Sequence, residues 1–466
     1  MEYLSSSQPA PGLPLSTRAI PLSSRSHLNR VDDGLSGTSG AQKIISQLNT
    51  QRSAVTKLTL NHNSLGDDGT SQLFTYLCST AGSRHRATLS EVSLTTNAIG
   101  CIGLQAIAEY IRGNDVLNTL WIANNELVPD AAVFSNLASA INGSRLRFLS
   151  LTGNPQLGDT FVEHFIPLLH SRHLQELHIN AIGLTPRSAA VIGAWISGRS
   201  LRNSGGMCYL QTFKCSGNSL GVKGVWEVIR AIERGNWGLT KVEMYANQLA
   251  GLPFAPDTGD PAPALQPLEA EPPSIPETEE AWKDAERGLH RILMRNGYWK
   301  RQTEKEALIL LKYSRPLLMH PKSTSIASSP SQPQSPLLPS ATTLFPFYAL
   351  PNELKLHILT LLAPSLASAQ RARIYHYASD PATLPPLVPS LRRDPGKGCL
   401  ADPSSLLGAS IGFQVTSPGG YSGQRCADGK CMGAGNSLLC RREEERVKFL
   451  EAVGCCAYEP EPEGQN

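Results

Sequence analysis

The sequence has little that would place it in a membrane or export it from the cell. No apolar run approaches the ~20 residues that a membrane-spanning helix needs, and the N-terminus lacks the basic start and apolar stretch of a secretory signal. Charge is nearly balanced, since 42 Lys and Arg face 39 Asp and Glu, so the net charge of +3 gives no electrostatic argument for nucleic-acid binding. We expect a cytoplasmic or nuclear protein with no membrane or nucleic-acid partner.

Motifs that mark catalytic centres are also missing. The sequence has no GxxxxGK[ST] phosphate loop, no GxSxG nucleophile turn and no HExxH zinc pair, and its histidines are scattered. These absences exclude the common nucleotide-hydrolysing, esterase-like and zinc-protease designs. We therefore expect a protein that is not an enzyme and that uses no cofactor.

The ten cysteines are scattered and do not form a disulfide framework. Four residues separate Cys426 from Cys431, a spacing that structural zinc tolerates, but no clean second pair follows. Cys455 and Cys456 are adjacent and poorly placed to bind one ion together. We expect free thiols and no metal, with a zinc site as the alternative.

A repeated pattern is the dominant feature that the sequence does contain. Its first copy begins at Val55 and reads apolar-x-x-Leu-x-Leu-x-x-Asn-x-Leu. The later copies follow at intervals of 34, 28, 29, 28, 36 and 29 residues, beginning at Leu89, Leu117, Leu146, Leu174, Leu210 and Leu239. Self-similarity at such a period is typical of stacked repeats that share one continuous core.

The spacing within one copy predicts a short strand, a turn and a helix. Leu58 and Leu60 are two residues apart, so they point to the same, inward face of a strand. An Asn follows where the strand ends, and its amide can satisfy backbone groups of adjacent turns that would otherwise be buried unpaired. This column comprises Asn63, Asn97, Asn125, Asn154, Asn218 and Asn247, with Ile182 interrupting it in the fifth copy.

A strand and a full helix in about 28 residues resembles the ribonuclease-inhibitor class of leucine-rich repeats, which includes the Ran GTPase-activating proteins. The resemblance covers roughly residues 28–250. It implies an α/β solenoid of horseshoe shape, with parallel strands on the concave wall and helices outside. A partial copy at 27–52 is expected to be the N-terminal cap. The function implied is protein binding or, as an alternative, Ran-type GTPase activation.

Outward strand residues of this solenoid would line the concave wall in columns. Trp121, Phe148 and His178 are expected to cluster near its middle, because neighbouring strands lie about 4.8 Å apart. Large aromatics exposed in this way are enriched at interface centres. The candidate partner-binding residues are Trp121, Phe148, His178, Lys214 and Tyr245. In the alternative interpretation, Trp121 is covered by a neighbouring side chain or by a linker.

Composition divides the rest of the chain. The expected parts are a disordered Ser/Pro-rich leader (1–26), the repeats with their cap (27–250), an acidic Pro-rich linker (251–279), a helical cap (280–320), a Ser/Pro linker (321–343), a short helical segment (344–392) and a Gly/Cys-rich tail (393–466). Within the tail, only 441–453 has a helical pattern.

Residues 350–362 carry a second pattern, Leu-Pro-x-Glu-Leu-x-x-x-Ile-Leu-x-x-Leu. It resembles the opening of an F-box, the helical module that docks onto the ubiquitin-ligase adaptor. The resemblance implies a substrate receptor whose docking residues are Leu350, Pro351, Glu353, Leu354, Ile358 and Leu361. The next residues, 366–377, lack the apolar pattern of a second helix. The alternative is an amphipathic helix that packs on the chain's own C-terminal region.

Overall fold

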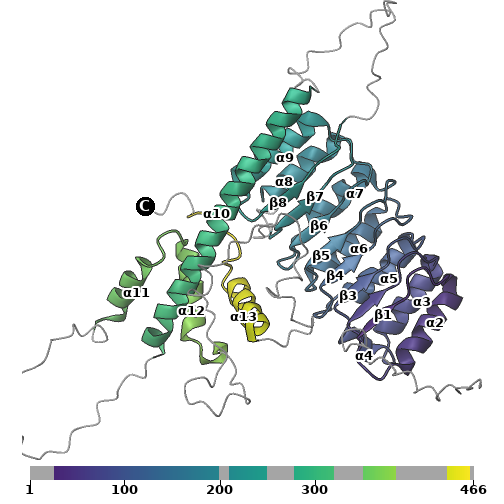
Figure 1. Cartoon of the computed structure of the whole chain (residues 1–466), viewed down its shortest axis with the longest axis horizontal. Coiled ribbons are helices and arrows are strands. Elements are labelled where there is room, and N and C mark those ends of the chain that lie inside the picture. The colour runs from purple at the N-terminus through teal and green to yellow at the C-terminus, as the bar shows by residue number, and fades with distance from the viewer. Residues whose placement is uncertain (1–25, 199–208, 249–277, 320–349, 385–437, 462–466) are drawn as a thin grey trace, which may run out of the picture.

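The computed structural model describes residues 26–198, 209–248, 278–319, 350–384 and 438–461 (Figure 1). The predicted leader, the acidic linker and the Ser/Pro linker lie outside these ranges except at their margins. Cys426 and Cys431 also lie outside them. None of the described helices is long and apolar enough to span a membrane.

The described repeats form one open sheet of eight parallel strands in chain order. The strands are β1 (His27–Asn29), β2 (Lys57–Thr59), β3 (Glu91–Ser93), β4 (Thr119–Trp121), β5 (Phe148–Ser150), β6 (Glu176–His178), β7 (Thr212–Lys214) and β8 (Lys241–Glu243). Parallel neighbours need a crossover, which helices provide here. These are α2 (Gly37–Thr50), α3 (Gly66–Cys78), α4 (Ser83–Arg86), α5 (Cys101–Ile111), α6 (Ala131–Asn142), α7 (Gly158–Phe165), η1 (Ile166–Leu168), α8 (Arg187–Ile196) and α9 (Gly221–Gly235). Figure 1 shows α2, α3 and α5 to α9 arrayed along one side of the sheet. The predicted alternation of strand and helix is confirmed.

The predicted strand register is confirmed by the pairing of neighbouring strands. Leu58 aligns with Val92, and Leu120 with Leu149, and all four side chains are fully buried. The inward leucines of successive copies therefore stack into one continuous core that also includes the apolar faces of the helices. At about 25 cal/mol per Å² of buried apolar surface, this burial is the main force that holds the repeats together.

The predicted asparagine column forms a hydrogen-bonded ladder beneath the turns. Asn125 donates through Nδ2 to the Leu94 carbonyl (3.1 Å), and its Oδ1 accepts from the backbone N–H of Asn97 (3.0 Å). One amide thus joins two adjacent turns whose backbone groups have no access to water. At the interruption, Ile182 is buried and its own N–H donates to Asn218 Oδ1 (3.0 Å).

The residue just before each ladder position has a left-handed backbone. Its φ lies between 49° and 73° in all seven copies, at His62, Thr96, Asn124, Gly153, Ala181, Gly217 and Ala246. Gly and Asn adopt this region readily, whereas Thr and Ala lose about 1 kcal/mol or more there. The turn is therefore imposed by the stacked repeats and not by a local turn residue.

The helix α10 (Glu279–Leu318) covers the end of the sheet and extends beyond it (Figure 1). In its first half, Ala285 and Ile292 join the repeat core. Buried Asn296 donates to the carbonyls of Asn236 (3.0 Å) and Leu239 (2.8 Å), just before β8. This half caps the last repeat, and the second half leaves the sheet.

The second half of α10 packs into a separate hydrophobic core and, with the elements that share this core, forms what we call the C-terminal module. It comprises α11 (Asn352–Thr360), α12 (Ser368–Ser379), η3 (Pro381–Thr383), α13 (Leu438–Ala452) and the segment 453–461, packed around Leu308, Leu311, Ile374 and Phe449. Residues 366–377 lack the apolar pattern of a second helix, yet most of them form α12. The helix α12 has little amphipathic pattern because its buried positions include the polar Gln370, which is fully enclosed.

The end of the predicted Gly/Cys-rich tail belongs to this module and returns to the sheet. Glu451 of α13 accepts from Arg147 (2.8 Å) and Gln175 (3.0 Å), which directly precede β5 and β6. Tyr458 contacts Trp237 and Trp299, with ring centroids 5.1 and 4.7 Å away. The module is therefore attached to the repeats both through α10 and through this returning segment.

A candidate partner-binding face of the sheet

Outward side chains of the strands form the surface of the sheet opposite the helices, which we call the strand face. One column of residues in register runs through Lys57, Glu91, Thr119, Phe148, Glu176, Thr212 and Lys241, and a second through Thr59, Ser93, Trp121, Ser150, His178, Lys214 and Glu243. Both columns contain charged and aromatic side chains and no aliphatic ones. This composition differs sharply from that of the inward column.

Three aromatic side chains meet at the centre of the strand face. The rings of Trp121 and Phe148 have centroids 4.2 Å apart and are tilted by 41°. The ring of His178 meets both edge-on, at 4.8 Å from Phe148 and 6.2 Å from Trp121. Trp121 and Phe148 remain partly exposed, while His178 is buried at 7% exposure. Trp121 is thus partly covered by its neighbours, and the cluster still presents aromatic surface to solvent.

A carboxylate lies at the edge of this aromatic cluster. Glu176 is in register with Phe148, and its Oε1 is hydrogen-bonded to His178 Nε2 at 2.7 Å. The Glu176 side chain keeps 30% of its surface exposed. The histidine therefore fixes the orientation of a carboxylate that solvent still reaches.

Lys214 is in register with His178 on the next strand and belongs to a group of charges at β7 and β8. Its Nζ is 3.2 Å from Glu243, which also contacts Lys241 at 3.1 Å. Burial raises the pKa of Glu243, but hydrogen bonds from Lys241 and Lys214 outweigh it and hold that pKa below its ordinary value. Two lysines around one carboxylate leave this end of the strand face with an excess of positive charge.

Tyr245 follows β8 and is separate from both groups. Its side chain is 63% exposed, and its backbone N–H donates to Ser216 Oγ (3.1 Å). The structure thus brings together three of the five sequence-predicted residues, Trp121, Phe148 and His178. It places Lys214 on the next strand beside His178, and Tyr245 beyond the end of β8.

The F-box-like residues lie at the outer side of the C-terminal module. Only Leu359 of α11 is buried in the module core, and Leu356 packs against it. Leu354, Ile358 and Leu361 are exposed at 49%, 39% and 70%, and Pro351 and Glu353 are exposed as well, whereas Leu350 is half-buried. The helix therefore has apolar residues on two sides, one turned inward and one toward solvent.

The contact between the sheet and the C-terminal module has no signal in the sequence. Arg147 and Glu451 are 304 positions apart, and neither belongs to a motif. Glu176 is recognisable in the sequence as an outward strand residue, but its bond to His178 is a finding of the structure. Residues two apart along a strand share a face, and this rule is the signal that could have pointed to the pair.

The two adjacent cysteines near the C-terminus belong to the module core, with Cys455 buried and Cys456 half-buried against it. Burial raises the pKa of the Cys455 thiol, and it also raises that of Cys456, to about 12. Cys455 is fully buried among apolar side chains. It therefore acts in this core as a small apolar residue.

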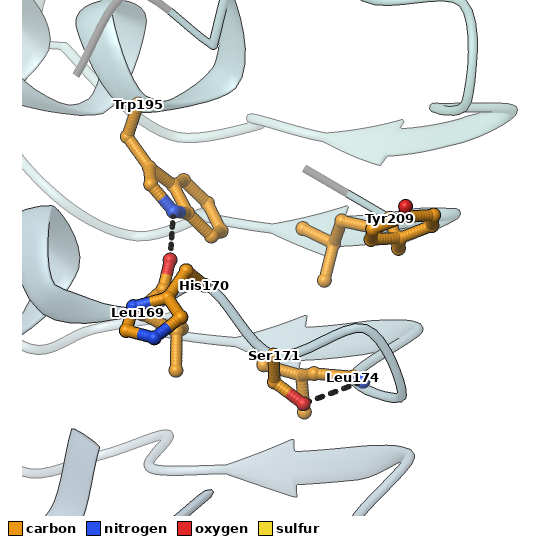
Figure 2. Close-up of a pocket in the computed structure, with 7 residues that line it drawn as sticks. Leu169, His170, Ser171, Leu174, Trp195 and Tyr209 are labelled. Atoms are coloured by element: carbon orange, nitrogen blue, oxygen red, sulfur yellow. Dashed lines mark hydrogen bonds between the residues drawn. The ribbon is translucent and has the colours of Figure 1, made fainter. Parts of the chain in front are cut away.

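A partly open cavity beside α8 is too small to be a ligand site (Figure 2). It holds about 10 Å³ and is lined by Leu169, His170, Ser171, Leu174, Trp195, Tyr209 and Leu210. Figure 2 shows the Trp195 indole N–H donating to the Leu169 carbonyl, at 2.7 Å. Such a volume has room for roughly one water molecule, whereas small-molecule sites span hundreds of Å³. The strand face remains the stronger candidate site.

Comparison with known proteins adds no functional assignment to this geometry. No model of a known protein family matches the chain, and a search of the curated proteins found no similar sequence.

Proposed function

We propose that this chain is a leucine-rich-repeat protein of the ribonuclease-inhibitor-like class that binds a protein partner on the concave strand face of a horseshoe-shaped solenoid. The repeat consensus, the parallel sheet and the asparagine ladder support the class assignment. In this proposal the chain acts as a non-catalytic scaffold, and the partner contacts Trp121, Phe148 and His178, with Lys214 and Tyr245 further along.

The partly exposed aromatic cluster is the observation that carries this proposal. Aromatic side chains dominate the energetic centres of protein interfaces because they bury a large area at low conformational cost. Here two of them are held rigidly by a third ring and by the sheet. A rigid anchor loses little entropy when a partner covers it, so the arrangement favours binding.

Quantitative affinity purification with the full-length chain tests the proposal. Trp121→Ala should reduce capture of the partner about thirtyfold, the equivalent of ~2 kcal/mol at a central anchor. Ile102→Ala is the matched control, because Ile102 is 66% exposed but lies on α5, on the helix side. A partner captured equally by wild type and Trp121→Ala but lost with Ile102→Ala would move the binding surface to the helices.

The exposed apolar side of α11 favours a second candidate function, that of an F-box-type substrate receptor. Leu354, Ile358 and Leu361 face solvent and do not enter the module core. A docking partner that covers them would gain the burial that this chain does not provide. In this proposal the strand face selects a substrate and α11 recruits the ligase adaptor.

Binding of the purified full-length chain to the ligase adaptor tests this candidate. Leu354→Ala combined with Ile358→Ala should abolish the interaction. Leu384→Ala should leave it intact, because Leu384 is similarly exposed at 49% but lies beyond η3. If wild-type chain does not bind the adaptor, the receptor function is excluded. The GTPase-activator alternative has no comparable structural observation in its favour and stays a prediction from the family resemblance.

A further inference from the structure

Glu176 is the carboxylate on the strand face that is best placed to receive a charge from outside the chain. Glu91, on the other side of the aromatic cluster, is already paired with Lys57 at 2.6 Å. Glu243 is held by two lysines. Glu176 is instead bonded to a buried histidine, and its exposed surface faces solvent. A carboxylate has about four acceptor positions, so one histidine leaves most of them available.

The arginine at the start of the neighbouring strand is engaged elsewhere. Arg147 directly precedes Phe148, yet its Nη2 donates to Glu451 of the C-terminal module at 2.8 Å. The module therefore holds this guanidinium at the edge of the sheet. Lys214, in register with His178, is paired with Glu243 at 3.2 Å. The aromatic surface and the Glu176 carboxylate at the sheet centre both favour a cation.

We propose that Trp121, Phe148 and Glu176 form a binding position for the guanidinium of an arginine side chain on the protein partner. This inference rests on the proposed binding function of the strand face. Aromatic faces attract cations, and Trp does so most strongly. A guanidinium is planar and can stack on a ring while its N–H groups reach a carboxylate in a bidentate contact.

The strand geometry matches these two contacts. Phe148 and Glu176 are in register on neighbouring strands, which lie about 4.8 Å apart. A guanidinium over the Trp121–Phe148 pair is therefore within reach of the Glu176 carboxylate. The hydrogen bond from His178 fixes that carboxylate, so little ordering is needed when the cation binds.

Selection of peptides on the immobilised full-length chain tests the inference. A random peptide library is selected on wild type, and peptides that also bind Trp121→Ala are removed. The recovered peptides should share an arginine at one position. For such a peptide, Glu176→Gln should weaken binding about tenfold, whereas a version with citrulline in place of arginine should bind equally weakly to both chains. Glu163→Gln, an exposed glutamate on α7, is the control and should have no effect.

The outcomes separate this inference from the function on which it rests. Peptides that depend on Trp121 but share no arginine, or share lysine instead, would overturn the arginine position and leave the strand face as a binding surface. Recovery of no Trp121-dependent peptide would count against both. Because Glu176→Gln preserves side-chain size, its melting temperature should match that of wild type, which keeps a binding loss interpretable.

Discussion

The sheet and the C-terminal module are held together in opposite ways. In the sheet, the core and ladder contacts join neighbouring copies and recur with the repeat, as the asparagine ladder shows. In the module, contacts join distant segments and each occurs once. Glu306 accepts from the Ser365 N–H across 59 positions, and Arg446 bonds Glu304 across 142. A repeated contact can be inferred from periodicity, whereas a unique one cannot.

The two regions should also differ in how far the destabilisation caused by one substitution extends. Repeats contact only their neighbours, so the stability of an array is approximately a sum of local terms. The module has a single small core to which four helices contribute side chains. Because all four helices share this core, a substitution in it should destabilise the whole module. The following substitutions test this difference.

Removing one core leucine in each region should have the largest effect. Leu120→Ala in β4 and Leu311→Ala in α10 each truncate a fully buried side chain and should cost 2 to 5 kcal/mol of folding free energy, as roughly expected for a core cavity. Hydrogen exchange resolved by segment should show Leu120→Ala acting on the repeats and Leu311→Ala on α11–α13. Equal effects of both substitutions throughout the chain would mean that sheet and module unfold as one unit.

Gln370→Leu should release the end of the chain with a somewhat smaller effect. The Gln370 amide donates to the carbonyls of Gly454 and Ala457, both at 3.1 Å, within a fully enclosed site. Leaving these carbonyls unpaired should cost about 2 kcal/mol. Exchange in 453–461 should rise while the repeats stay protected. The exposed Gln42→Leu is the control, and unchanged protection of 453–461 in Gln370→Leu would contradict the prediction.

Thr96→Gly should stabilise the repeats by about 0.5 to 1 kcal/mol in denaturant unfolding, because glycine removes the strain of a β-branched residue at φ 57°. Gly153 occupies the equivalent position, at φ 73°. Gly153→Ala should destabilise, since an added Cβ would clash with Asn124 Oδ1. A loss of stability in Thr96→Gly would show that its side chain makes a compensating contact.

Replacing residues 251–277 by a Gly/Ser sequence of equal length should have the smallest effect. Their Pro-rich, acidic composition predicts a linker that buries little surface, and this segment lies outside the described residues. The melting temperature of the repeats should stay within a few degrees of wild type. A larger fall would show that the segment packs on the folded chain.

The strands of the sheet could be predicted residue by residue from the sequence, because the spacing of their side chains follows from strand geometry. A strand period of two separates Leu120 from Trp121, so the inward core and the outward columns were both predictable. The left-handed turn position was not, since His62, Thr96 and Ala181 have no common turn chemistry. These turns are stabilised by hydrogen bonds from the ladder asparagines and not by the left-handed residues themselves.

Helices were expected at 280–320, 344–392 and 441–453, but the assembly of the C-terminal module from them was not predicted, for a related reason. Helix α12 buries Gln370, whose polarity hides the inward face of the helix from a search for apolar periodicity. The hydrogen bond by which His178 orients Glu176 could not be predicted either, because side-chain direction depends on rotamers that a sequence does not specify. In this chain, the regularly spaced apolar residues could be predicted to form a core. Polar contacts that occur only once could not be predicted from the sequence.

The length of α10 has a consequence for the whole molecule. A helix of 40 residues is about 60 Å long, and each added residue would advance its far end by ~1.5 Å and rotate it by about 100°. Asn296 fixes one part of α10 to the last repeat, while Glu451 and Tyr458 return from the far module to the same sheet. One extra residue after Asn296 would turn those returning side chains away from their contacts. The number of residues in α10 therefore sets the angular phase between the strand face and the exposed side of α11.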